Sequence, residues 1–293
     1  MAEESLKKKY KSRSMAQETW RRLLQNKGAI FAMIFMVVLV GAAIASGFIF
    51  DYETDVIGQN MAEKLMAPCA QHWFGTDEYG RDLFARVIYG ARYSLIIGCG
   101  SVMIGLVVGT ILGSLAGFYG GIMDSLLMRA NDILYSIPNI MIAVVIVSVL
   151  GTSTFNLLLA LCVSCATSLS RIVRASVMTI RDQEYIEAAY AMGLPTWKII
   201  IKHIIPNCLS PIIVQVTLLI GTTIISASSL SFLGIGVPAP APEWGALLSA
   251  GRGHIRDASY MCIIPGLAIM LTVLALNLLG DGLRDALDPK LKK

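Results

Sequence analysis

Long apolar runs separated by polar segments dominate this chain of 293 residues. A helix needs roughly 20 apolar residues to cross the hydrocarbon core of a bilayer. The runs lack the strict alternation that marks a membrane β-barrel, so we expect helices. The pattern therefore predicts an all-α membrane protein with six transmembrane helices, at 29–50, 93–118, 133–150, 155–170, 211–236 and 260–280.

Basic residues indicate how these spans are oriented. With the N-terminus in the cytoplasm, the inside segments carry 18 Lys and Arg residues and the outside segments carry six. Positive charge gathers on the cytoplasmic side, so both N- and C-termini are predicted to be cytoplasmic. We divide the chain into a cytoplasmic N-terminal arm (1–28), a first span with an extracytoplasmic segment (29–92), and a five-span core (93–293) that contains a cytoplasmic loop (182–206).

Composition agrees with a membrane protein, since only 15% of the residues are charged, against about 25% in soluble domains. The net charge of +4 changes the picture little. Lys7, Lys8, Lys9 and Lys11 form a basic cluster that we expect to lie near anionic membrane lipid. No basic surface interleaved with aromatic residues follows it, so nucleic acid is not an expected partner.

Several polar residues and a proline inside the apolar runs are candidates for a transport pathway. Pro138 is expected to kink or break the third span, since proline removes a helix hydrogen bond, and the helix can begin well before residue 133. Broken helices at membrane depth can mark substrate sites. We expect some hydroxyl groups of span five to bond to their own helix and the others to line a polar passage or bridge helices. The pathway candidates are Pro138, Thr222, Ser226, Ser229 and Asn277.

Small residues recur every four positions along the second span. Residues four apart share a helix face, and a small-residue face lets two membrane helices approach closely. The stripe is therefore predicted to pack against another helix. It runs from Ser101 through Gly105, Gly109, Gly113 and Gly117.

Catalytic and cofactor-binding motifs are missing from the sequence. There is no phosphate-binding G-x-x-x-x-G-K-S/T loop, so this chain is not expected to bind ATP or to be an enzyme. Cys162 and Cys165 lie inside an apolar run and are interpreted as packing residues, so no metal site is expected. No acidic or basic residue sits in mid-span, which disfavours an ion-coupled carrier.

A polar island at 182–206 stands between two apolar runs. Asp182 is expected to cap a helix of about three turns. Gly193 is expected to end it in a left-handed conformation, and Pro195 to prevent its continuation. The small Ala188 and Ala189 would let another protein approach closely.

This island resembles the cytoplasmic coupling loop of ABC importer permeases. Five positions of that pattern match here in register, while His203 and Ile205 depart from it mildly. The matching residues are Glu187, Ala188, Ala189, Gly193 and Pro206. The resemblance implies an ATPase-coupling segment made by Glu184, Glu187, Ala188, Ala189, Gly193 and Pro195, with Glu187 as a charged anchor.

A second run resembles the signature of one subfamily, the second permease of peptide and nickel ABC importers. Its extracytoplasmic signature residues are Gly75, Thr76, Asp77, Gly80, Arg81 and Asp82. Trp244 and Gly245 resemble a further segment of peptide permeases, and the tail at 280–289 resembles their C-terminal signature.

The resemblance implies the type I ABC importer permease fold in the cytoplasmic membrane of a prokaryote. It also implies a homologous second permease, two ABC ATPase subunits that carry ATP and Mg²⁺, and an extracytoplasmic solute-binding protein as partners. The expected solute is a dipeptide or oligopeptide. A nickel, glutathione-like peptide or other solute importer of the same family remains an alternative. The alternative functions from other classes are a carrier or channel that works alone and a membrane enzyme.

Overall fold

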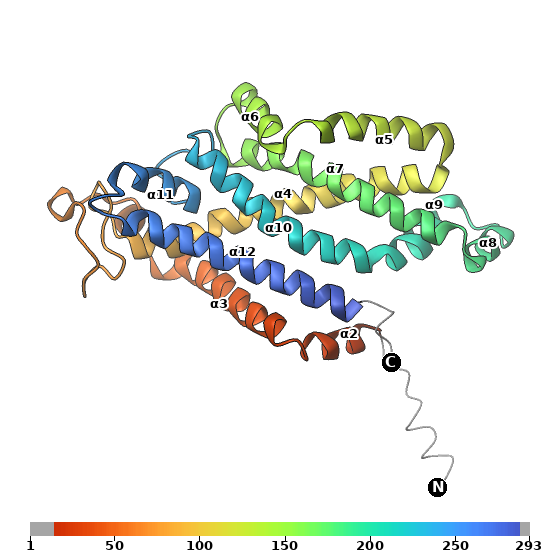
Figure 1. Cartoon of the computed structure of the whole chain (residues 1–293), viewed down its shortest axis with the longest axis horizontal. Helices are drawn as coiled ribbons and strands as arrows, with labels where there is room; N and C mark the ends of the chain where they lie inside the picture. The colour runs from red at the N-terminus through yellow and green to blue at the C-terminus, as the bar shows by residue number, and fades with distance from the viewer. Residues whose placement is uncertain (1–14, 288–293) are drawn as a thin grey trace, which may run out of the picture.

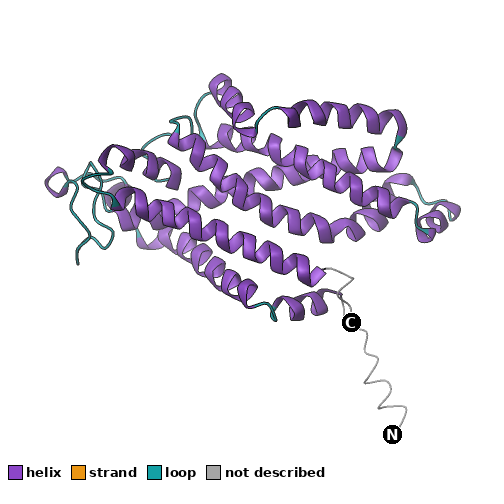
Figure 2. Cartoon of the chain, in the orientation of Figure 1, coloured by secondary structure: helices purple, strands orange, loops and turns teal. Residues whose placement is uncertain are grey.

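The computed structural model describes residues 15–287, and within this range it contains helices and no β-strand (Figure 2). An isolated bridge joins Thr76 to Asp82. The basic cluster at Lys7–Lys11 and the last residues of the tail lie outside the described residues. The helices are α2 (Met15–Leu23), α3 (Lys27–Ile49), α4 (Leu83–Tyr119), α5 (Gly121–Ser136), α6 (Asn139–Leu150), α7 (Thr154–Arg181), α8 (Glu184–Ala191), α9 (Thr196–Ile199), α10 (Leu209–Phe232), α11 (Trp244–Gly251) and α12 (Tyr260–Leu287).

Five long helices, α3, α4, α7, α10 and α12, run along the long axis of the molecule (Figure 1). Helices α3, α4, α7 and α12 are each long and apolar enough to cross a membrane. Helix α10 is the second part of a continuous helical stretch, Thr196–Phe232, that is also long and apolar enough. The pair α5 and α6 supplies a sixth crossing if it counts as one bent span. This confirms the all-α membrane architecture. Helix α11 and residues 50–82 lie at one end of the bundle, called here the α11 end, and α8 and α9 lie at the other, the α8 end (Figure 1).

The third predicted span differs most from the observed helices. Its helix begins at Gly121, and the chain bends by 88° between Ser136 and Asn139. Pro138 immediately precedes α6, so proline breaks the helix there. The fourth span, predicted at 155–170, runs on to Arg181, because polar contacts with α5 retain its charged second half in the bundle.

Those contacts fix α5 to α7. Arg174 Nη2 donates to Asp124 Oδ2 at 2.6 Å. Asn131 Nδ2 donates to the Thr167 carbonyl at 3.3 Å, and Ser170 Oγ donates to Asn131 Oδ1 at 2.9 Å. Buried polar groups are stabilising only when they are paired, so these bonds specify one position for α5.

The glycine stripe of α4 lies against α7. A Cβ atom added to Gly105 would lie 2.5 Å from the Cys165 Cβ, and one added to Gly113 would lie 2.5 Å from the Ser170 carbonyl oxygen. Gly109 and Gly117 meet the same helix. The two backbones therefore lie closer together than any side chain at these positions would allow, which gives dispersion contacts along the pair.

Candidate functional site

The N-cap of the helix that follows α7 lies one residue later than the sequence indicates, at Gln183 instead of Asp182. Asp182 ends α7 and accepts a bond from Arg181 Nε at 3.2 Å, so the prediction that it caps the next helix is wrong. Gln183 occupies the N-cap position of α8, and its side chain donates to the Thr179 carbonyl at 3.3 Å. Helix α8 has eight residues, about two turns rather than three.

The end of α8 has the predicted left-handed turn. Gly193 has a φ of 76°, and its N–H donates to the Tyr190 carbonyl at 2.9 Å. The Leu194 N–H donates to the Ala189 carbonyl at 3.2 Å, which completes the cap. Pro195 then directs the chain into α9.

The two faces of α8 have different surroundings. Ile186 and Ala189 are buried against Val173 and Val177 of α7. Glu184, Glu187 and Ala188 are exposed, together with Gly193 and Pro195. Of the two alanines expected to face a partner, Ala189 instead packs inside this chain, because the three-to-four-residue period places it on the face of Ile186.

Two large exposed side chains beside α8 escaped the sequence argument. Met192 is 73% exposed and Trp197 is 59% exposed. Both are hydrophobic residues in a polar loop, and that signal was present in the sequence. Exposed apolar groups next to carboxylates are typical of a protein-binding surface.

The loop is packed into the bundle. Ile199 and Ile204 are fully buried in the same cluster as Ile212 of α10, while Ile186 joins it from α8. Packed side chains therefore connect α8 to α7 and α10.

The hydroxyl residues of α10 share one face, which leads towards the α11 end. Thr222, Ser226 and Ser229 each donate back to their own helix, at 3.0, 3.0 and 2.8 Å. Each of these hydroxyl oxygens also has acceptor capacity, which its donated bond does not use. Asn277 is exposed on α12 and lies beside Gly221 of α10. Pro138 belongs instead to the bend before α6.

A small pocket continues this face at the α11 end. Its volume is about 380 Å³, and it lies between α10, α11 and α12. Its lining residues include Ile225, Ser229, Phe232, Gly245, Leu248 and Ile269.

Helix α11 is held over this pocket by buried contacts. Trp244 Nε1 donates to the Val87 carbonyl at 2.9 Å. A Cβ on Gly245 would lie 2.4 Å from the Ser228 Cα.

Glu243 caps α11 from a fully buried position, accepting from the Ala246 N–H at 3.0 Å and from Ser94 Oγ at 3.3 Å. It thereby joins α11 to α4. The sequence resemblance covers Glu243 as part of a Glu-Trp-Gly segment but gives it no role, because glutamate is not among the residues preferred at an N-cap.

The signature residues at 75–82 come together as one folded turn before α4. Asp77 accepts from the Arg81 N–H and from Arg81 Nε, at 3.0 and 2.6 Å. Thr76 Oγ1 accepts from the Met66 N–H at 2.8 Å. Gly80 has a φ of 72°, and a Cβ there would lie 1.7 Å from the Asn60 carbonyl oxygen. Gly75 is likewise left-handed at 77°.

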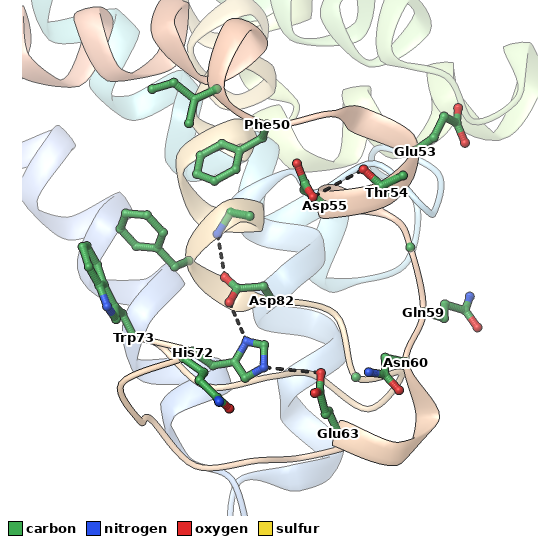
Figure 3. Close-up of a pocket in the computed structure, with 16 residues that line it drawn as sticks. Phe50, Glu53, Thr54, Asp55, Gln59, Asn60, Glu63, His72, Trp73 and Asp82 are labelled. Atoms are coloured by element: carbon green, nitrogen blue, oxygen red, sulfur yellow. Dashed lines mark hydrogen bonds and ion pairs between the residues drawn. The ribbon is translucent and has the colours of Figure 1, made fainter.

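Asp82 ends this turn and caps α4, accepting from the Ala85 N–H at 2.9 Å. Its other oxygen lies 2.7 Å from His72 Nδ1, and His72 Nε2 lies 3.4 Å from Glu63 Oε2 (Figure 3). These residues line an open cavity of about 890 Å³ between residues 49 and 85. On its rim, N–H groups of Thr54 and Glu53 donate to Asp51 and lower the pKa of that carboxyl.

Two parts of this chain match known protein families. Residues 109–293 match the family described as binding-protein-dependent transport system inner membrane component. Residues 14–68 match the N-terminal TM domain of oligopeptide transport permease C.

Two curated relatives match over nearly their whole length. The dipeptide transport system permease protein DppC of Alkalihalophilus pseudofirmus is 44% identical over 283 residues, covering 97% of this chain and 92% of the relative. The glutathione transport system permease protein GsiD of Pectobacterium atrosepticum is 42% identical over 277 residues, covering 94% and 91%.

A solved structure shares the fold. A chain of the MetNI methionine ABC transporter, in an inward-facing conformation, superposes with a TM-score of 0.57 at 21% identity, covering 70% of this chain and 98% of that chain. Together with the family matches, this shows that the chain belongs to the family of binding-protein-dependent transport system inner membrane components, as a permease subunit.

Proposed function

We propose that this chain is a permease subunit of an ATP-driven ABC importer that moves small peptides across the cytoplasmic membrane. One observation carries the proposal. Helix α8 presents exposed carboxylates, Met192 and Trp197 to one side, and is fixed on its other side to α7 and α10. Such a segment can receive force from a bound protein and transmit it to the spans.

The coupling step follows from this geometry. The exposed face of α8 enters a cleft of an ATPase, where Glu184 and Glu187 meet basic groups and Ala188 allows close approach. Closure of two ATPases on ATP and Mg²⁺ displaces α8. Because Ile186 and Ile199 are packed against α7, that displacement tilts α7 and α10 together and biases the spans between inward-open and outward-open arrangements.

The pathway in this proposal runs along α10. Thr222, Ser226 and Ser229 offer acceptor oxygens to peptide N–H groups, and Asn277 offers both a donor and an acceptor. A homologous second permease faces this surface and completes the passage. As a membrane component of this family the chain is not an enzyme, and in this proposal ATP and Mg²⁺ bind to the partner subunits.

The proposal also assigns each end of the bundle to one side of the membrane and names the class of solute. The α8 end faces the cytoplasm with both termini, and the α11 end receives solute from an extracytoplasmic binding protein. Relatives named for dipeptide and for glutathione transport favour a peptide solute. A nickel importer of the same family is the alternative that the solute assay decides.

The test is purification of the tagged full-length chain in mild detergent, with its partners identified and ATPase activity measured. We expect a second permease and two ATPases to be recovered. In proteoliposomes that also receive the binding protein, labelled dipeptide uptake should follow ATP. A chain recovered alone whose transport ignores ATP contradicts the importer, and ATP-driven uptake of nickel but not peptide contradicts the solute.

A further inference from the structure

Arg92 occupies an unusual position on α4. Its guanidinium lies against Gly47 of α3, where an added Cβ would be 2.2 Å from Arg92 Nη1. The three atoms nearest to such a Cβ all belong to that guanidinium, at 2.2, 3.1 and 3.4 Å. The missing side chain of Gly47 thus leaves space for the positive charge at the surface of a membrane helix.

Arg92 has no anionic partner among residues 15–287. Its recorded contact is with the ring of Tyr89, whose centroid lies 5.1 Å from the guanidinium carbon. The three arginines of α7 behave differently: Arg171, Arg174 and Arg181 each form an ion pair with an aspartate. A guanidinium left at a lipid-facing surface is costly unless it finds an anion.

Two features place Arg92 near the interface between the bilayer and water. Gly47 lies two residues before α3 ends. Tyr52, Tyr89 and Tyr93 form a contiguous aromatic group there, with ring centroids 5.4 and 6.3 Å apart. Tyrosines collect at the headgroup level of membranes, where lipid phosphates also lie.

An apolar row on α3 leads to this charge. Val37, Ile44 and Phe48 share one face and are 72%, 61% and 90% exposed. Gly41 belongs to the same row, and no atom lies within 4 Å of the position its Cβ would take. The row is an exposed apolar surface of the kind that contacts an acyl chain.

We propose that Arg92 and Gly47 form a binding site for the phosphate group of a phospholipid, whose acyl chain lies along the exposed row of α3. The planar guanidinium matches a phosphate by two parallel N–H···O bonds, which are stronger than neutral hydrogen bonds. A free phosphate ion shares this chemistry, so the test must separate the two sources.

The experiment measures binding of dioctanoyl phosphatidylglycerol to the full-length chain, purified with its partners and delipidated, by native mass spectrometry. Arg92→Gln should weaken binding at least about tenfold, as expected for loss of a charge-assisted pair. Gly47→Ala keeps the charge but displaces the guanidinium, and should give a comparable loss. Arg256→Gln removes an exposed arginine of the loop before α12 and should bind like wild type.

Two further probes identify the source of the phosphate. Dioctanoylglycerol has the same chains without phosphate and should bind at least about tenfold more weakly to wild type. Inorganic phosphate that displaces the lipid at equal concentration would show a site for the free ion and overturn the lipid assignment. Wild-type binding by both Arg92→Gln and Gly47→Ala overturns the site itself.

Discussion

At the residue scale, left-handed glycines set the turns at both ends of the bundle, and the sequence located them by two different signals. Gly193 stands before a proline at the end of a short helical pattern, so its conformation could be predicted from general rules. Gly80 could be singled out only by resemblance to a signature. Its reason emerges from the fold, because the Asn60 carbonyl, twenty residues earlier, occupies the space of a side chain.

Replacing Gly193 tests the turn after α8. An L side chain at a φ of 76° costs about 1–2 kcal/mol, although space for its Cβ is free. Gly193→Val places a β-branched residue there and should therefore leave a folded chain whose α8 is misdirected, with ATPase capture and peptide uptake reduced at least about fivefold. Gly193→Asn is the control, since asparagine tolerates this conformation. Undiminished uptake by Gly193→Val would contradict the coupling role.

Replacing Gly80 tests the turn before α4. Alanine there combines a strained φ with a clash against backbone, so we expect Gly80→Ala to lower the free energy of unfolding by about 3 kcal/mol or more. Thermal unfolding in detergent measures the loss. Gly253→Ala, also near the α11 end but with open space for the added methyl group, should stay within about 0.5 kcal/mol of wild type. Equal melting temperatures would show that the turn is not rigid.

At the scale of elements, apolar runs predicted the existence of the spans better than their ends. Hydrophobicity finds the apolar first half of α7, but its charged second half stays helical through partners on α5 that are 39 to 50 residues away. The 88° bend after α5 has a local cause, Pro138, while the direction of the bend depends on packing that no local pattern encodes.

The α4–α7 pair gives the prediction that belongs to this scale. A Cβ on Gly109 would lie 2.8 Å from the Leu169 Cβ and 2.9 Å from the Ala166 carbonyl oxygen, so Gly109→Leu must separate the two helices. We expect a loss of about 3 kcal/mol or more, seen as faster proteolysis and poor assembly with the second permease. Gly41→Leu adds the same side chain to an open face of α3 and should assemble normally.

At the scale of the whole molecule, sequence resemblance singled out the loop at 182–206, but only the packed structure shows which of its residues are exposed. The repeat of small residues at 188 and 189 looks symmetrical in sequence. In the fold Ala188 faces outward and Ala189 supports the loop from within. The contacts of Ile199 and Ile204 with two different spans, on which the proposed lever rests, depend on tertiary packing and could not be predicted from local patterns.

Trp197 provides the sharpest test of that lever. Its side chain is largely exposed, so Trp197→Ala should change the free energy of unfolding by no more than about 0.5 kcal/mol. If the tryptophan is an anchor for an ATPase, its loss should cost about 2 kcal/mol of binding, or roughly 30-fold in affinity, and uncouple ATP hydrolysis from uptake. Trp20→Ala removes a similarly exposed tryptophan from α2 and should leave ATPase capture unchanged. Wild-type capture by Trp197→Ala would place the ATPase contact elsewhere on the α8 end, whereas selective loss would show that force enters the bundle through the α8–α9 turn.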